Sequence, residues 1–179
     1  DGLYDPLTDD LGLIGFCRPE GQESIVVPIR SIHGQYLYPD NELVDVLRVI
    51  AEWMTDPRFV TAGWNSDYYD KTVIEENFRR WIGIPITPAP RLDGILLHHV
   101  VASEHFHSLA FVASVYTDAP AWKNEGSATN AKSDLEWATY NGRDDAITAR
   151  VLHPLIKEAA RIGAFTPRHP STPSLLTVE

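Results

Sequence analysis

The stretch LGLIGFCRPEGQESIVVPIR, residues 11–30, decides the fold class of this chain. Its beginning, residues 11–17, is a short apolar run that predicts a buried strand. A turn at PEGQ separates this run from residues 24–30, which predict a second strand and a hairpin partner. Proline cannot donate a hydrogen bond to a sheet ladder, so Pro28 favours an edge position for the second strand.

Helices and strands alternate after this hairpin. Apolar spacing and turn residues predict a helix over 40–54, a strand over 59–64, a helix ended by Gly83, an extended start at 91–97, a helix over 107–116 and a long helix over about 133–162. Asp40 or Asn41 would cap the first helix, and His107 or Ser108 the helix over 107–116. This order predicts an α/β domain with a mixed sheet flanked by helices.

A chain of 179 residues suits one domain. We expect it to span residues 1–165, because residues 166–179 contain two prolines and predict a tail or linker. Neither a membrane span nor a signal peptide is predicted, because the chain has no long apolar run and no basic-then-apolar start. The single cysteine, Cys17, is predicted in a buried strand and fits a reducing, cytoplasmic compartment.

The charge balance restricts how this chain could handle nucleic acid. A formal net charge of −10 argues against a module that holds nucleic acid by bulk electrostatics. It leaves nucleic acid open as a substrate, because carboxylates that hold divalent metals make a site acidic until the metals bind.

Two polar residues follow the strand over 59–64, at the strand end where ligands gather in open α/β sheets. Asn65 comes directly after the strand, and Asp70 lies in the first turn of the next helix. Each residue also has an ordinary structural role. Asp70 could complement the helix dipole, and Asn65 could bond its own loop backbone. Taken alone, the structural roles are the better interpretation.

The long helix carries YNGRDD, residues 140–145. Tyr140 and Asp144 are four residues apart, so they share a helix face and can reach one site together. Asp145 lies about 100° further round the helix and points elsewhere. The alternative is a solvated acidic face with Tyr140 in the core, and it is favoured when this motif is considered in isolation.

Together, Asp70 and Asp144 favour a metal site. Carboxylates from separate elements repel one another when they converge, unless a divalent cation lies between them. Hard oxygen ligands select Mg²⁺ or Mn²⁺. Two such ions about 4 Å apart can hold both the attacking and the leaving oxygen of a phosphodiester. A tyrosine hydroxyl on the same face could orient the attacking water.

Two segments resemble motifs of the DEDD-type 3′–5′ exonucleases. GWNSDYYDKTVI resembles the second exonuclease motif, and YNGRDDAIT resembles the third. The Tyr-x-x-x-Asp spacing is that of the tyrosine subgroup, which includes the proofreading domains of family A DNA polymerases. RLDGILLHHV and HSLAFVASVYTDAPAWK also resemble phage and bacterial polymerase exonuclease domains, and the likeness extends to about Leu155.

The resemblance implies a ribonuclease-H-like fold, two Mg²⁺ or Mn²⁺ ions, and stepwise hydrolysis of DNA from its 3′ end in proofreading. Asp70 and Asp144 would be metal ligands, Tyr140 would help to position the nucleophilic water, and Asn65 would lie beside the substrate strand. The expected substrates are single-stranded DNA and frayed 3′ ends. A polymerase domain or subunit would be the partner, in a bacterial cytoplasm or in that of a phage host, with no membrane involved.

The first motif of that family, Asp-x-Glu on the first strand, is absent from the start of this chain. Asp1, Asp5, Asp9 and Asp10 do not supply the pattern. An N-terminal truncation, loss of the motif in a scaffold protein, and a misplaced register would each explain this. Truncation is favoured, because that strand lies in the middle of the implied sheet and its loss would leave neighbouring backbone groups unpaired. We therefore expect a sheet whose first strand is missing.

Other residues offer weaker chemistry. The histidines and the glutamate of HHVVASEHFH, residues 98–107, could bind zinc, but they do not match the usual ligand spacing. Asp93 could face the site or bond loop amides. Lys123 could touch a phosphate or be solvated, and Trp122 could stack on a base or pack.

The sequence therefore supports a leading function and two alternatives. The leading hypothesis is a metal-dependent 3′–5′ exonuclease. The absent Asp-x-Glu motivates the first alternative, a catalytically inactive exonuclease-like module that binds DNA or a polymerase partner. The second alternative, an unrelated acidic metal phosphoesterase, would act on mononucleotides and not on strands.

Overall fold

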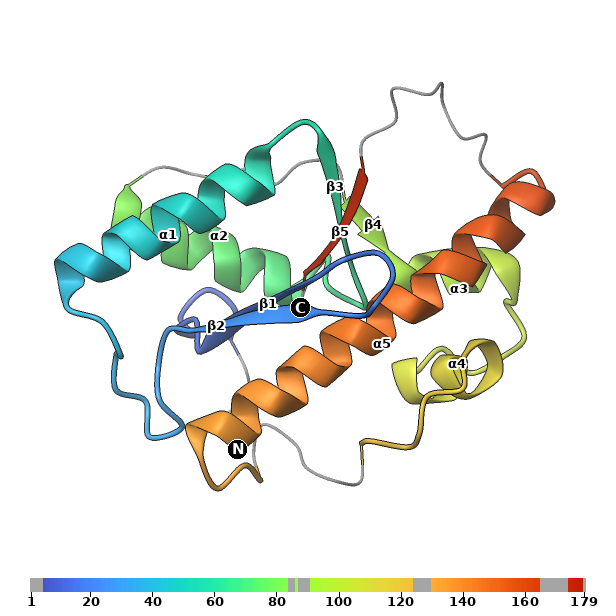
Figure 1. The fold of residues 1–179 in the computed structure, drawn as a ribbon. Helices are drawn as coiled ribbons and strands as arrows, with labels where there is room; N and C mark the ends of the chain where they lie inside the picture. The colour runs from blue at the N-terminus through green and yellow to red at the C-terminus, as the bar shows by residue number, and fades with distance from the viewer. Residues whose placement is uncertain (1–4, 84–85, 87–90, 124–129, 165–173, 179) are drawn as a thin grey trace.

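The computed structural model describes residues 5–83, 86, 91–123, 130–164 and 174–178 (Figure 1). Its strands form one mixed five-stranded sheet in the order β2-β1-β5-β3-β4. The strands are β1 (Leu13–Cys17), β2 (Ser24–Pro28), β3 (Phe59–Gly63), β4 (Arg91–Asp93) and β5 (Ser174–Val178). β1 is antiparallel to both β2 and β5, whereas β3 is parallel to both β5 and β4. The predicted α/β class with a mixed sheet is confirmed.

The N-terminal hairpin forms as predicted. Phe16 pairs with Ile25 in the antiparallel register of β1 and β2. β2 is an edge strand, as Pro28 predicts, so the missing N–H of this proline costs no ladder bond to a further strand.

The C-terminal segment differs from its prediction. Residues 166–179 are expected to be a tail or linker, but Ser174–Val178 form β5 in the middle of the sheet. The pairing of Cys17 with Thr177 on one side, and of Thr61 with Leu176 on the other, joins β1 to β3 through this strand. The absence of a first strand predicts a gap in the middle of the sheet. β5, from the C-terminal end of the described chain, occupies this position.

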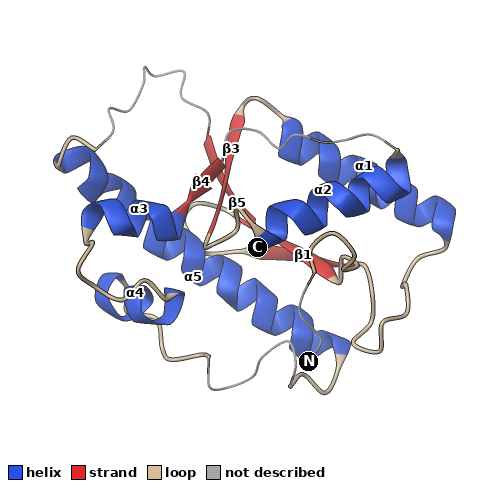
Figure 2. Cartoon of the chain, turned by 180° about the vertical axis from the view of Figure 1, so that it is seen from behind, coloured by secondary structure: helices blue, strands red, loops and turns tan. Residues whose placement is uncertain are grey.

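Five helices surround this sheet in the described residues: α1 (Asp40–Thr55), α2 (Tyr69–Ile82), α3 (Gly94–Val101), α4 (Leu109–Tyr116) and α5 (Asp134–Arg161). α1 packs against α2, and α5 runs along β1 and β2 and past α3 and α4 (Figures 1 and 2). Two predicted caps are confirmed: Gly83 ends α2 with a left-handed φ of 68°, and Ser108 caps α4. The predicted side-chain cap of α1 is wrong, because this helix follows Pro39 without a side-chain cap bond.

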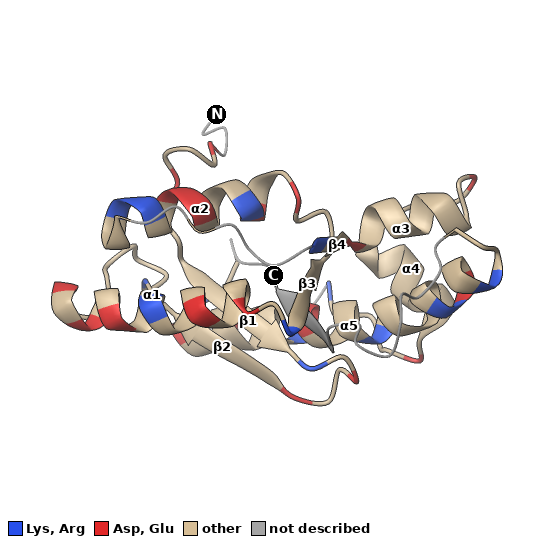
Figure 3. Cartoon of the chain, turned by 90° about the horizontal axis from the view of Figure 1, so that it is seen from above, with Lys and Arg blue, Asp and Glu red and all other residues tan. Residues whose placement is uncertain are grey.

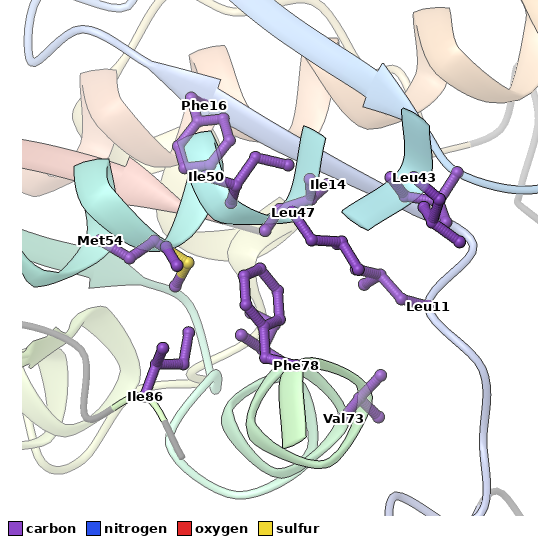
Figure 4. Packing of buried hydrophobic residues seen from close by; sticks show 13 residues of the cluster. Leu11, Ile14, Phe16, Leu43, Leu47, Ile50, Met54, Val73, Phe78 and Ile86 are labelled. Carbon is purple, nitrogen blue, oxygen red and sulfur yellow. The ribbon is translucent and has the colours of Figure 1, made fainter. Parts of the chain in front are cut away.

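Successive residues of β1 point to opposite faces of the sheet, and each face is covered by different helices. Ile14 and Phe16 belong to an apolar cluster with α1 and α2, which Figure 4 shows around Phe78 and Leu47. Gly15, between them in sequence, faces α5 instead. A second cluster lies among α3, α4 and α5 and includes Trp122 and Leu152. The hairpin therefore lies between α1 and α2 on one face and α5 on the other.

Removal of β5 tests whether this strand holds the sheet together. We expect a chain that ends at residue 173 to lose cooperative thermal unfolding, because β1 and β3 would each have a row of unpaired backbone groups. Circular dichroism would follow the transition. A chain that lacks only residue 179 is the control, and a peptide of residues 171–179 added in trans should restore cooperativity. Unchanged melting of the shorter chain would contradict the central role of β5.

Candidate functional site

The loop between β3 and α2 is held in place by Asp93. The backbone N–H groups of Asn65 and Asp67 donate to the Asp93 carboxylate at 3.1 and 3.2 Å. The same side chain accepts from Ile95 N at 2.9 Å and so caps α3. Asn65 has a φ of 58°, in the left-handed region that asparagine tolerates better than most residues. Asp93 thus bonds loop amides, and it positions the exposed Asn65 at the end of β3.

Asp70 lies in the first turn of α2 and is half-buried. Burial raises the pKa of this carboxyl to about 6, although Arg91 and the Asp70 backbone N–H act in the opposite direction, and Asp93 raises the pKa further. Burial penalises the charged form, and no cation in the described residues forms an ion pair with Asp70. A bound cation would lower this pKa and stabilise the carboxylate.

Asp70 opens onto a cavity of about 510 Å³ at the beginning of β1. From the other side, α5 contributes Trp137 and Asn141 to the wall. The buried Oδ1 of Asn141 has no hydrogen-bond partner among the described residues. Residues from the second and third motif-like segments therefore line the same cavity.

The other two carboxylates of this cavity already have partners. Asp9 accepts a hydrogen bond of 2.6 Å from the Tyr69 hydroxyl. Asp10 forms ion pairs with Arg30 at 2.8 Å and with Arg80 at 3.0 Å. Asp70 is thus the cavity carboxylate that, among the described residues, has neither an ion pair nor a hydrogen bond from another side chain.

Tyr140 and Asp144 lie together, as their spacing predicts, and Lys123 joins them. The Lys123 ammonium donates to the Tyr140 hydroxyl oxygen at 3.0 Å and to the two Asp144 oxygens at 2.9 and 2.7 Å. The buried Trp122 donates its indole N–H to Asp144 Oδ1. Burial lowers the pKa of Lys123, but the bonds to Asp144 and Tyr140 outweigh it and hold this pKa above its usual value. This Lys123–Asp144–Tyr140–Trp122 group carries one positive and one negative charge.

Asp145 faces the sheet, whereas its neighbour Asp144 faces the Lys123 loop. The Asp145 side chain is fully buried, and it approaches the backbone of Gly15 so closely that a Cβ there would lie 1.9 Å from its Oδ2. Asn141, one turn earlier, would lie 2.5 Å from the same Cβ through its Oδ1. The two adjacent aspartates point in different directions, as helix geometry requires. On α5, the two residues four apart whose side chains contact the sheet are Asn141 and Asp145.

Sequence reasoning therefore identifies only part of this arrangement. Tyr140 and Asp144 come together, and Asp70 reaches the cavity beside α5, but no described hydrogen bond or ion pair joins Asp70 to Asp144. The motifs do not predict Asn141, which also lines the cavity. Its signal is present in the sequence, because Asn141 and Asp145 are also four residues apart and share a helix face.

The fit of divalent metals differs between the two carboxylates. No group of three or more His, Cys, Asp or Glu side chains suited to a metal ion occurs among the described residues. Asp70 offers a hard carboxylate donor to the cavity, of the kind that suits Mg²⁺ or Mn²⁺, whereas the amide oxygen of Asn141 is buried against Gly15. Asp144 does not fit in this arrangement, because the Lys123 ammonium contacts both of its oxygens.

The histidines of residues 98–107 pack with one another. The Nδ1 atoms of His98 and His107 lie 2.7 Å apart, and the ring of His99 stacks on that of His107 with centroids 3.4 Å apart. Burial, and then the neighbouring His107, His105 and His99, lower the pKa of His98. A hydrogen bond between two imidazoles needs one neutral ring, so a neutral His98 fits this packing.

The distribution of charge differs between α1 and α2. Figure 3 shows mostly acidic residues along α1, with Arg48 as its basic residue, whereas α2 carries residues of both signs, including the pair of Arg79 with Glu76 one turn away. In the described part of the chain, no helix is both long enough and apolar enough to span a bilayer.

Comparison with known proteins adds no relative. The chain matches no protein-family model, no curated protein and no solved structure. A functional interpretation of this chain therefore rests on the geometry of the site.

Asp70 should make stability depend on pH in metal-free buffer. Its folded-state pKa of about 6 lies above the ordinary value of 3.8, so the folded protein binds a proton more tightly than the unfolded chain. Its contribution to the unfolding free energy is complete below about pH 4 and is lost as the pH rises through about 6. Asp70→Asn removes this loss, and should stabilise the fold by roughly 1–3 kcal/mol at pH 7.5 and by little at pH 4.

Urea denaturation with EDTA at both pH values measures this difference. Asp118→Asn is the matched control, because the Asp118 side chain is 90% exposed and pairs with Arg150. An Asp70→Asn protein no more stable than the parent at pH 7.5 would show that the buried charge costs nothing.

Gly15→Ala tests the close approach of α5 to β1. The new methyl group would overlap the Asp145 carboxylate, and we expect a loss of roughly 2–3 kcal/mol in unfolding free energy. Gly142→Ala is the control, because its Cβ would lie 3.3 Å from the nearest Val26 carbon, and it should stay within about 1 kcal/mol of the parent. Equal denaturation midpoints for the two variants would contradict the packing of Asp145 on Gly15.

Proposed function

We propose that this chain is a 3′–5′ exonuclease domain that hydrolyses DNA from its 3′ end and serves in proofreading. The observation that carries this proposal is the cavity at the beginning of β1. Asp70, from the segment GWNSDYYD, and Asn141, from the segment YNGRDD, line its walls. Segments that resemble two separate exonuclease motifs thus meet at one place, although more than 60 residues separate them.

The sheet also supports a ribonuclease-H-like fold. The resemblance implies a first strand in the middle of the sheet, and β5 takes the middle position between β1 and β3. The segment SLLTVE contains this strand and one acidic residue, Glu179, which lies outside the described residues. The described part of β5 contributes no carboxylate.

Several residues have roles in the proposed reaction. Asp70 would be a ligand of a divalent ion, which supplies positive charge and an activated water for phosphodiester hydrolysis. Tyr140 would orient the water or a phosphate oxygen through its hydroxyl. Asn65, exposed at the end of β3, would contact the substrate strand. Single-stranded DNA suits an acidic chain, because a short 3′ end needs fewer cationic contacts than a duplex.

The second candidate is a catalytically inactive exonuclease-like module that binds DNA or a polymerase partner. The ion pair between Lys123 and Asp144 favours it, because this pair blocks one of the two carboxylates expected to bind metal. Such a module would bind single-stranded DNA or the partner without releasing nucleotides.

Release of nucleotides from 3′-labelled single-stranded DNA distinguishes the two candidates. With Mg²⁺ or Mn²⁺, we expect the full chain to release labelled nucleotide, and Asp70→Asn and Asp144→Ala to lower the rate by about 10²-fold or more, since each removes a group on which the site depends. Asp118→Asn, an exposed aspartate on another surface, should keep the parental rate.

Fluorescence anisotropy with the same oligonucleotide measures binding separately. Binding without release would support the inactive module. Release that is unaffected by Asp144→Ala would rule out a role for the third motif-like segment in the reaction.

A further inference from the structure

A pair of histidines joins α3 to the loop that precedes α4. His98, on α3, is 1% exposed, and its Nδ1 lies 2.7 Å from Nδ1 of His107. The side chains of residues 103–106 in this loop are exposed, whereas that of His107 is half-buried. His107 is therefore the side chain through which the loop is anchored on α3.

This contact requires at least one neutral ring. Between the two Nδ1 atoms one imidazole must donate and the other accept, and two protonated rings offer two donors and no acceptor. The ring of His99 also stacks on that of His107, with centroids 3.4 Å apart, and a charge there would add to the repulsion. The charged groups that act on His98 are the other histidines, and no acidic side chain among the described residues offsets them.

The pH range in which the pair is stable follows from these surroundings. Burial, and then the neighbouring imidazoles, lower the pKa of His98 below its ordinary value of 6.5. The contribution of the pair to stability is therefore complete above pH 6.5 and is lost as the pH falls through the lowered pKa. Tyr116 of α4 also faces His98, at 6.1 Å between ring centroids, but burial and then Glu158 of α5 raise the pKa of this phenol. Tyr116 thus stays neutral where histidines titrate.

Trp64 connects this pair to the candidate site. Its indole N–H donates to the backbone oxygen of His107 at 3.1 Å. Its ring lies against Gly94 at the start of α3, where a Cβ would come within 2.5 Å of it. Trp64 is directly followed by Asn65, whose backbone N–H donates to Asp93. A movement of His107 therefore reaches the end of β3 through one hydrogen bond.

We propose that His98 and His107 form a pH-sensitive clasp, which is closed at neutral pH and opens in mild acid when both rings are protonated. Opening would release the loop between α3 and α4 and break the hydrogen bond from Trp64 to His107. Histidine suits such a switch, because it is the side chain whose ordinary pKa lies closest to neutral pH.

The opening is expected to be local. The apolar cluster of α3, α4 and α5 buries three side chains of α4, namely Leu109, Val112 and Ala113. Apolar burial does not depend on the charge of the histidines, so both helices would stay packed while the loop between them moves. The movement would reach Asn65, which is proposed to contact the substrate strand. The clasp itself does not depend on the proposed exonuclease function.

The indole N–H of Trp64 gives a direct readout in proton–nitrogen NMR spectra of the full chain, and Trp64→Phe assigns its resonance. As the pH falls from about 7.5 to about 5, the range in which histidines gain a proton, we expect this resonance to shift. Its exchange with solvent should increase by about tenfold or more relative to that of Trp122, because proton binding favours the open form. Trp122 is the internal reference, since its indole donates to Asp144.

His98→Asn and His107→Asn test the mechanism. The asparagine amide offers both a donor and an acceptor, so it can bond the remaining histidine in either protonation state. Each variant should therefore keep the Trp64 indole protected at both pH values, and one folded variant is enough. His153→Asn removes an exposed histidine of α5 and is the matched control, which should respond as the parent does. Circular dichroism establishes which variants are folded.

The proposal is overturned if the Trp64 resonance of the parent is the same at both pH values, or if that of Trp122 moves with it. It is also overturned if a folded His98→Asn or His107→Asn protein responds to pH as the parent does. Another group would then cause the response, such as Asp70 with its pKa of about 6.

Discussion

The backbone pairing of β5 is the constraint on which the described structure depends. β1 pairs with β2 and β5, and β3 pairs with β4 and β5, so in the part of the chain that the structure describes the two halves of the sheet meet through this strand alone. The cavity that holds Asp70 lies at the beginning of β1, while the loop that positions Asp70 follows β3. The relative position of these elements, and hence the shape of the cavity, follows from a strand far away in the sequence.

A second constraint sets the position of α5. Asp145 and Asn141 pack onto Gly15, and the absence of a side chain at this glycine lets the helix approach the sheet. Because successive residues are about 100° apart on a helix, this contact turns Asp144 away from the sheet. Tyr140, one turn earlier, then packs against the cluster of α3, α4 and α5 and meets Lys123. A single close contact thereby decides which aspartate faces which neighbour.

Local signals in the sequence predict much of the fold, and non-local contacts account for the rest. The hairpin, Gly83 and Ser108 depend on residues close in sequence, and they are found as predicted. At β5, the flanking prolines predict a tail, and the segment is a strand because it pairs with β1 and β3. At the site, spacing alone brings Tyr140 to Asp144. It cannot show that Asn141 reaches the cavity, because that depends on how α5 lies on the sheet.

If the proposed exonuclease function holds, the two candidate carboxylates must accommodate an anionic substrate. A phosphodiester is repelled by unpaired carboxylates, so each would have to be neutralised before DNA could approach. Lys123 neutralises Asp144 from within the chain, whereas Asp70, with a pKa of about 6, needs either a proton or a cation from solution. The site would therefore accept an anion when a divalent ion is present at neutral pH. Metal binding and substrate binding would be coupled through Asp70, and Asp144 would take no part in that coupling.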